Sequence, residues 1–202
     1  MKAWKILNNV TIQQCSNDLI IKLLLQNRGL KTKKEIEEFL KPPDPQSLKP
    51  ETLNIKTKEL DKAVKRIMKA IKDHESIVVY GDYDADGVCA TAILWETLNS
   101  MGAKVMPYIP HRVEEGYGLS EKGMKAVKKE FDVKLIITVD HGITAWEKVE
   151  YGKKMGIDFI ICDHHVLPEK LPKAVAIIHT TQLCGAGVAW MLVQALKKND
   201  NL

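Results

Sequence analysis

The chain has 202 residues, of which 45% are hydrophobic and 28% are charged, as is ordinary for a globular protein with a buried core. No apolar run approaches the roughly 20 residues that cross a membrane, and the N-terminus lacks the layout of a signal peptide. We therefore expect a cytoplasmic protein without a membrane partner. The formal net charge of +4 is compatible with a polyanionic ligand but too small to indicate one, and nothing indicates an oligomeric state.

The cysteines form no CxxC pair, which disfavours both a zinc ribbon and a disulfide framework. We expect them to be small, buried, apolar residues instead. They are Cys15, Cys89, Cys162 and Cys184.

Residues 1–56 are predicted to form a small helical extension and a linker, without a large core of their own. Ser16 or Asn17 can cap a first helix, and Thr32 opens a second one with the TKKE pattern of a capping box. The KPPDP sequence then ends the second helix, because proline removes a backbone donor and clashes with the preceding turn. Residues 41–56 are the expected linker.

From residue 57 to residue 202, predicted strands alternate with predicted helices. Thr144 and Glu147 are expected to form a capping box at one helix start. The alternation implies an α/β domain with a doubly wound, mainly parallel sheet and helices on both faces. We expect strands at 76–80, 104–109, 134–139, 157–162 and 174–178, and helices at 57–73, 87–101, 120–130, 144–155 and 185–197.

Three aspartates, Asp82, Asp84 and Asp86, alternate in the GDYDADG segment that follows the first strand. Two carboxylates about 5 Å apart repel by roughly 3 kcal/mol at an effective dielectric of about 20, so such a cluster favours a cation between them. Hard oxygen ligands suit Mg²⁺ or Mn²⁺. An EF-hand calcium loop is disfavoured because Ile93 stands where that loop needs a glutamate. A solvated acidic turn is the remaining, weaker alternative.

Two further strands end in polar clusters, Asp140-His141-Gly142 and Asp163-His164-His165. The carboxyl ends of parallel strands lie along one edge of the sheet, where ligands bind in this architecture. Carboxylates and an imidazole at that edge are the set expected for a two-metal site. The side chains expected to converge there are Asp82, Asp84, Asp86, Asp140 and His164.

These motifs, in this order, resemble the DHH phosphoesterase superfamily. Within it, the RecJ group of single-strand-specific exonucleases is similar over nearly the whole chain. The matching segments are NRG at Asn27–Gly29, FLKP at Phe39–Pro42, YGDYDADG, YIPHRVEEGYGLS at Tyr108–Ser120, and LCGAGVAW at Leu183–Trp190. The VDxG pattern at Val139–Gly142 is shared with the wider superfamily, in which the position of His141 is variable.

The resemblance implies a pair of Mn²⁺ or Mg²⁺ ions that activate water against a phosphodiester. The implied activity releases nucleotides from the 5′ end of single-stranded DNA in repair and recombination, with replication or repair proteins as possible partners. Asp84, Asp86 and His164 match metal ligands of the family, and Asp82 matches a residue that ligates or orients the site. Asp140 matches the aspartate that bridges both ions.

The resemblance also implies roles for residues around the metals. His165 is expected to face the phosphate, and Asp163 to orient the histidine pair. Substrate-binding candidates are Arg112, Tyr117, Gly185 and Gly187, through a guanidinium on phosphate, stacking on a base, and backbone amides at a helix start. The alternatives are that Arg112 pairs with a nearby glutamate, that Tyr117 packs locally, and that the two glycines only allow close packing.

The sequence departs from the family in residues 179–182, which replace an Asn-Pro and a longer loop. The resemblance also implies that a fourth-motif aspartate and a second catalytic subdomain lie beyond Leu202. Three functions therefore stay open: a RecJ-type exonuclease core, a DHH phosphoesterase acting on short oligonucleotides or cyclic dinucleotides, and a non-catalytic scaffold in a replication or repair assembly.

Overall fold

The computed structural model describes residues 16–199, and the chain divides into two compact units, residues 1–48 and 49–202. The predicted division after residue 56 stays a prediction. Cys15 lies outside the described residues, as does the start of the predicted helical extension. None of the described helices is long and apolar enough to cross a membrane.

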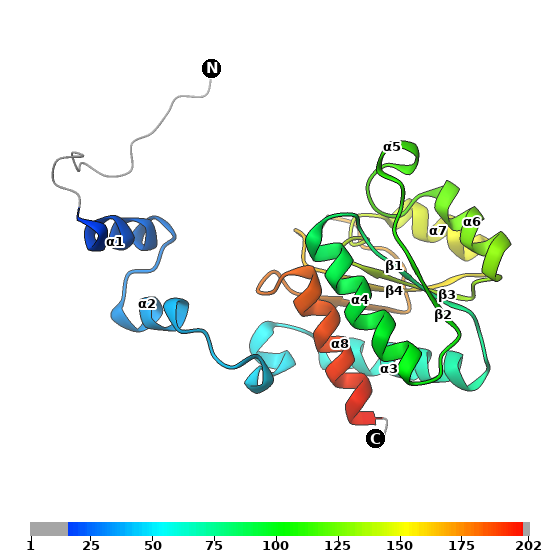
Figure 1. Cartoon of the computed structure of the whole chain (residues 1–202), viewed down its shortest axis with the longest axis horizontal. Helices are drawn as coiled ribbons and strands as arrows, with labels where there is room; N and C mark the ends of the chain where they lie inside the picture. Colours follow the sequence, from blue (N-terminus) through cyan, green and yellow to red (C-terminus); the bar gives the residue numbers. More distant parts are fainter. Residues whose placement is uncertain (1–15, 200–202) are drawn as a thin grey trace. The chain divides into compact units, whose positions relative to one another are not determined.

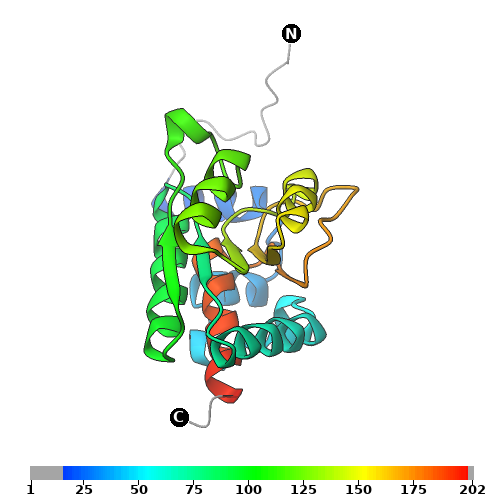
Figure 2. The same cartoon turned by 90° about the vertical axis from the view of Figure 1, so that its right-hand side faces the viewer.

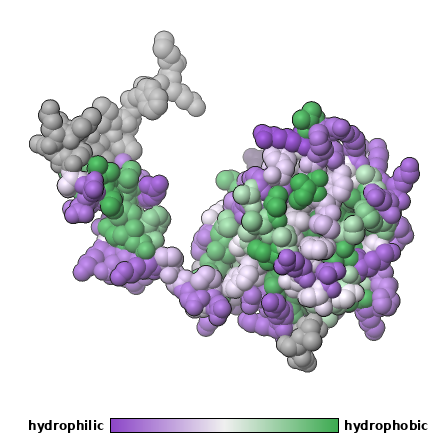
Figure 3. All heavy atoms as spheres, in the orientation of Figure 1, coloured by the Kyte–Doolittle hydropathy of each residue, from purple (hydrophilic) through white to green (hydrophobic). Residues whose placement is uncertain are grey.

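The first unit contains two short helices, α1 (Asn17–Asn27) and α2 (Lys33–Leu40). The Ser16 hydroxyl accepts a bond from the Leu19 amide, and Thr32 forms the predicted capping box with Glu35. Apolar surface lies over α1 in Figure 3. The exposed apolar side chains of the two helices include Ile20, Ile21, Leu24, Phe39 and Leu40. The 3-10 turn η2 (Pro45–Ser47) follows.

The second unit is built on a five-stranded sheet in which every neighbouring pair is parallel (Figure 1). The strand order is β2-β1-β3-β4-β5, and the register pairs Tyr80 with Thr138, Val139 with Cys162, and Asp163 with His179. The strands are β1 (Ile77–Tyr80), β2 (Val105–Tyr108), β3 (Leu135–Val139), β4 (Asp158–Asp163) and β5 (Ala176–His179). The predicted parallel sheet is confirmed.

Helices cover both faces of this sheet (Figures 1 and 2). On one face, α4 packs against α8 and α8 packs against α3, and on the other α6 packs against α7. Strand side chains such as Val78, Ile136 and Phe159 form a buried core with Met124 of α6 and Val149 of α7. The helices are α3 (Thr57–Lys72), α4 (Ala85–Ser100), α6 (Glu121–Phe131), α7 (Trp146–Lys154) and α8 (Gly185–Asn199), with the short α5 (Arg112–Glu115) and the 3-10 turn η3 (Pro50–Leu53).

Some local predictions were wrong. Helix α4 begins at Ala85 rather than at residue 87, because the Asp84 carboxylate caps it by accepting from the Gly87 amide at 2.9 Å. Helix α7 has no capping box, since Ala145 occupies its cap position without a side-chain bond. The expectation of buried cysteines holds for Cys162 but fails for Cys89 and Cys184, which are exposed.

Candidate metal centre

The candidate site lies where β1, β3 and β4 end. In the strand order β2-β1-β3-β4-β5, the connection from β1 leads to one side of the sheet and the strands from β3 onward are added on the other side, so the switch point lies between β1 and β3. Ligands bind beyond the strand ends at such a switch point in sheets of this kind. The segment with Asp82 and Asp84 follows β1, Asp140 follows β3, and His164 follows the end of β4. The fold therefore brings residues from three distant parts of the chain to one edge.

Asp82, Asp84 and Asp140 form an acidic cluster in which one oxygen of each carboxylate lies within 4.8 Å of the others. Asp82 and Asp140 are each only 2% exposed. The Oδ1 atom of Asp82 is buried without a hydrogen bond to any residue of 16–199, and the Oδ1 atom of Asp140 has His164 Nε2 as its neighbour. Buried carboxylate oxygens without partners are costly, so this cluster fits a divalent cation.

His164 and His165 form a second group with Asp140 in which ligand atoms again lie within 4.8 Å of one another. The His164 Nε2 atom is 3.0 Å from Asp140 Oδ1 and 3.7 Å from Asp86 Oδ2. Asp140 is thus shared by both groups. Carboxylates with one imidazole are donors that suit Mn²⁺ or Mg²⁺.

The environment of Asp140 is unfavourable for a negative charge. Burial, followed by repulsion from Asp86 and Asp84, raises the pKa of Asp140 to about 7. Its backbone is also in the left-handed region, at φ 65°, which few residues other than glycine adopt without cost. Strain and a perturbed pKa at one residue are typical of functional sites.

Asp163 holds the loop that carries both histidines. Its Oδ1 atom accepts from the His164 amide at 2.7 Å, the His165 amide at 3.1 Å and His165 Nδ1 at 2.7 Å, and its Oδ2 atom accepts from the Ile143 amide at 2.8 Å. Burial opposes the charge of Asp163, but these bonds outweigh it and lower its pKa. The imidazole of His165 is therefore fixed through Nδ1, which leaves Nε2 to face outward.

Asp86 lies apart from both groups, in the first turn of α4. Its two carboxylate oxygens accept from the Gly185 amide at 2.6 Å and the Ala186 amide at 2.7 Å, at the start of α8. Burial opposes its charge, but bonds from Ala186, Gly185 and the Cys184 thiol lower its pKa. These two hydrogen bonds connect α4 to the start of α8. The contact of Asp86 with the candidate site is the 3.7 Å distance from its Oδ2 atom to His164 Nε2.

His141 is buried and has an internal role. Its Nε2 atom lies 3.0 Å from the carbonyl oxygen of Tyr80, and its ring packs edge-on against the Tyr80 ring. Burial lowers the pKa of His141, so the ring is neutral near neutral pH. These contacts connect the segment that follows β3 to β1.

Comparison with known proteins agrees with this geometry. Residues 76–202 match the family model described as "DHH family, N-terminal domain". The chain belongs to the DHH family. Its metal-site segments after β1, β3 and β4 all fall within the matched residues.

Similar members of the DHH family include the single-stranded-DNA-specific exonuclease RecJ of Bacillus subtilis (strain 168). The chain is 39% identical to it over 186 residues, which are 88% of this chain and 23% of that relative. The fold is similar to that in the crystal structure of exonuclease RecJ bound to manganese, with a TM-score of 0.66 and 34% sequence identity. The match covers 80% of this chain and 40% of the RecJ chain. RecJ from Thermus thermophilus in complex with Mn²⁺ is 32% identical, with a TM-score of 0.63, over 90% and 25% respectively.

Aromatic residues of this DHH-family chain line the approach to the acidic cluster. The Arg112 guanidinium lies 4.8 Å from the centre of the Tyr83 ring, and Tyr83 packs edge-on against Tyr117 at 6.4 Å. Tyr117 is 6.4 Å from the His165 ring, and its hydroxyl donates to the Asp140 carbonyl at 3.3 Å. Sequence reasoning missed Tyr83, although an aromatic side chain inside a polar DYDADG loop was a usable signal.

The local ion pair considered for Arg112 is not formed. Glu114 bonds to Lys122 at 2.6 Å, and Glu115 accepts from the Tyr108 hydroxyl and from Ser120. The guanidinium therefore rests on the Tyr83 ring instead of on a carboxylate. The guanidinium N–H groups of Arg112 make no hydrogen bond to another residue of 16–199, so they are available to an anion.

Gly185 has a steric role next to Asp140. A Cβ atom at Gly185 would meet Asp140 Oδ1 and would lie 2.6 Å from its Cγ atom. At Gly187, by contrast, a Cβ atom would lie 3.1 Å from the Leu183 Cβ atom, which a small shift relieves. The absence of a side chain at Gly185 lets the first turn of α8 approach the acidic cluster.

We expect Gly185→Ala to weaken Mn²⁺ binding by about tenfold or more, because the new methyl group displaces the Asp140 carboxylate. Alanine favours a helix over glycine by about 1 kcal/mol, so helix propensity does not explain a loss. Gly187→Ala is the matched control and should bind Mn²⁺ as the unmodified chain does. Calorimetric titration with Mn²⁺ measures both, and equal affinities for the two variants would contradict the steric role.

Proposed function

We propose that this chain is the metal-dependent core of a RecJ-like exonuclease that hydrolyses phosphodiesters of single-stranded DNA. The observation that carries the proposal is the meeting of the buried carboxylates of Asp82 and Asp140 with Asp84 and His164 at the switch point of the sheet. Support comes from relatives named single-stranded-DNA-specific exonuclease RecJ. The chain aligns with 23% of the length of the Bacillus subtilis protein. In the same proposal, residues 1–56 form the extension and residues 57–202 the phosphoesterase domain.

In this proposal, two Mn²⁺ or Mg²⁺ ions would be held by Asp82, Asp84, Asp140 and His164. Asp86 would become a further ligand when its carboxylate releases the amides at the start of α8. When bound, the ions supply an activated water and stabilise charge on the phosphate oxygens. Two cations would also relieve the repulsion that raises the pKa of Asp140. The need for such relief favours a catalytic site over a non-catalytic scaffold.

His165 is proposed to act on the phosphate with its Nε2–H group. Burial disfavours the imidazolium form, but the bond to Asp163 outweighs burial and raises the pKa of His165. A larger protonated fraction makes the ring a better donor to a phosphate oxygen. Asp163 fixes the orientation of the ring and prevents it from rotating away.

The approach formed by Arg112, Tyr83 and Tyr117 is proposed to receive nucleic acid. Aromatic rings stack on bases without regard to sequence, and a guanidinium binds phosphate through two parallel bonds. Gly185 fits a packing role better than a phosphate-binding role, because Asp86 already accepts from its amide.

We expect Mn²⁺-dependent release of nucleotides from single-stranded oligonucleotides that carry a label at either end. Early appearance of labelled mononucleotide from the 5′-labelled strand distinguishes cleavage from the 5′ end. A duplex of the same sequence and a dinucleotide serve as alternative substrates, and Asp140→Asn is the inactive control. Cleavage of the dinucleotide alone would support the small-substrate phosphoesterase instead. No cleavage above the control would overturn the enzymatic proposal for this chain.

A further inference from the structure

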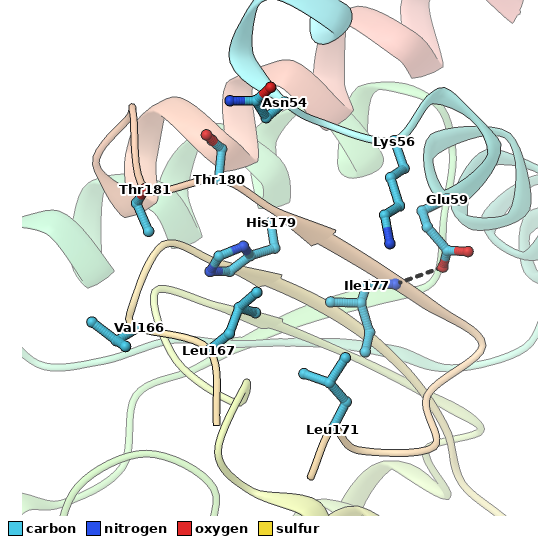
Figure 4. Close-up of a pocket in the computed structure, with 10 residues that line it drawn as sticks. All are labelled: Asn54, Lys56, Glu59, Val166, Leu167, Leu171, Ile177, His179, Thr180 and Thr181. Atoms are coloured by element: carbon cyan, nitrogen blue, oxygen red, sulfur yellow. Dashed lines mark hydrogen bonds between the residues drawn. The ribbon is translucent and has the colours of Figure 1, made fainter. Parts of the chain in front are cut away.

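A hollow lies next to the outer strand β5 and the loop that follows β4 (Figure 4). Its volume is about 600 Å³, within the range of about 300–1,000 Å³ typical of small-molecule sites. Aliphatic side chains from β5 and from the loop after β4 form one wall: Val166, Leu167, Leu171 and Ile177. Val166 is 82% exposed and Leu167 is 53% exposed, so this wall is apolar surface without a protein partner among residues 16–199.

This pocket is joined to the histidine loop of the metal centre. The His179 Nε2 atom donates to the carbonyl oxygen of His165 at 2.7 Å, and His179 is paired with Asp163 in the sheet register. Val166, in the pocket wall, is the next residue after His165. A molecule in the pocket therefore touches the same loop that places His164 and His165 at the acidic cluster.

The pocket also contains a cation that is not neutralised by an ion pair. Lys56 makes no salt bridge within residues 16–199, and its ammonium group extends toward the hollow in Figure 4. Glu59, the acidic residue in the lining, accepts from Lys62 Nζ at 2.7 Å and from the Ile177 amide at 3.1 Å. Glu59 is paired with Lys62 and is also close enough to Lys56 to feel its charge. Two ammonium groups and one carboxylate leave an excess of one positive charge at this end of the pocket, which suits an anion.

Polar side chains complete the lining at the end opposite the aliphatic wall. The side chains of Asn54 and Thr181 make no hydrogen bond to another residue of 16–199, and both line the hollow. An amide and a hydroxyl can bond to the edge of a base or to a sugar hydroxyl. An aliphatic wall, two polar groups and one ammonium match the base, sugar and phosphate of a nucleotide.

We propose that this pocket is a nucleotide subsite that binds a nucleoside 5′-monophosphate, with the base against the aliphatic wall and the phosphate on Lys56. The inference rests on the proposed function, because hydrolysis from a 5′ end releases this class of product beside the histidine loop. The proposed subsite lies next to β5, and the loop that carries His164 and His165 joins it to the acidic cluster.

The test is a metal-free titration, so that the acidic cluster contributes no bound cation. The ¹⁵N-labelled full chain in EDTA is titrated with deoxythymidine 5′-monophosphate, thymidine or inorganic phosphate, and amide shifts are followed by NMR. We compare Lys56→Ala with Lys58→Ala, which removes a lysine of the same helical region that does not line the pocket. Leu171→Trp fills the hollow from an exposed position.

We expect the monophosphate to shift amides around residues 166–181 and to bind about tenfold more weakly to Lys56→Ala, because a charge-assisted bond is lost. Lys58→Ala should bind as the unmodified chain does, thymidine should bind both lysine variants equally, and Leu171→Trp should lose binding. If Leu171→Trp is not folded, the two lysine variants decide the result.

Equal affinity of Lys56→Ala and Lys58→Ala for the monophosphate would overturn the subsite, as would shifts confined to the acidic cluster. Absence of monophosphate binding would also overturn it. The Mn²⁺-dependent cleavage assay is independent of these readings. Cleavage without monophosphate binding refutes only the subsite, and binding without cleavage refutes only the proposed activity.

Discussion

Asp140→Asn will lower the affinity for Mn²⁺ by about a hundredfold or more, since it removes a charged ligand common to both groups of metal-binding side chains. Asparagine is the right replacement because it keeps the shape of the side chain and tolerates the left-handed backbone at φ 65° better than alanine. A loss therefore reports on the missing charge and not on a refolded loop. Calorimetry with Mn²⁺ measures the affinity.

Asp132→Asn is the matched control for this variant. Asp132 also has a left-handed backbone, at φ 46°, but it ends α6 and pairs with Lys128 and Lys134 away from the site. We expect Asp132→Asn to bind Mn²⁺ with unchanged affinity. Wild-type affinity in Asp140→Asn would refute the assignment of Asp140 as a metal ligand, whatever the control shows.

Ionisation of Asp140 will destabilise the metal-free chain as the pH rises from about 5 to 8. The pKa of Asp140 is raised from its ordinary value of 3.8 to about 7, so the folded chain binds this proton more tightly than the unfolded chain does. Between these two values the folded state holds more protons, and the contribution of Asp140 to stability falls with rising pH. The whole contribution is at most about 4 kcal/mol, of which about 3 kcal/mol is lost between pH 5 and 8, because each pH unit below the raised pKa changes it by about 1.4 kcal/mol.

The other groups near the site change stability in both directions. His165 has a raised pKa, so its contribution is present at acidic pH and is lost in the same direction as the pH rises. His141 has a lowered pKa because it is buried, so its contribution grows as the pH rises through the ordinary value of 6.5 and opposes the effect of Asp140. Asp86 and Asp163 have lowered pKa values, so their stabilisation is complete above pH 5 and is lost only in stronger acid. The difference between the unmodified chain and Asp140→Asn therefore isolates the contribution of Asp140.

Thermal unfolding of the unmodified chain and of Asp140→Asn in EDTA at pH 5, 6, 7 and 8 measures this dependence. Asp140→Asn should remove the part due to Asp140, leave the opposing parts due to His165 and His141, and raise the Tm at pH 8 above that of the unmodified chain. Mn²⁺ should restore stability to the unmodified chain, and more strongly at higher pH, because the ion binds the ionised carboxylate. If the Tm of Asp140→Asn does not rise relative to that of the unmodified chain between pH 5 and 8, the raised pKa is contradicted.

The strands and their parallel order were predictable because their signals are local. Runs such as Ile77–Tyr80 and Leu135–Val139 are mostly apolar and buried throughout, as is expected of strands covered on both faces, and glycine or aspartate follows their ends. The sheet-edge rule then predicted that the residues after these strands meet, and the structure places Asp82, Asp84 and Asp140 together. Their roles in binding metal stay a proposal with a defined test.

Contacts between segments far apart in the chain had no local signal. The amino-acid pattern was enough to predict the strands, their common edge and the ligand-type residues on it. The packed fold was needed to show that Asp86 accepts from amides of Gly185 and Ala186, 99 and 100 residues away. The same holds for the stacking of Arg112 on Tyr83 and for the bond of His179 to the histidine loop. Periodicity encodes which face of an element is buried, whereas partners across the fold depend on how the elements pack.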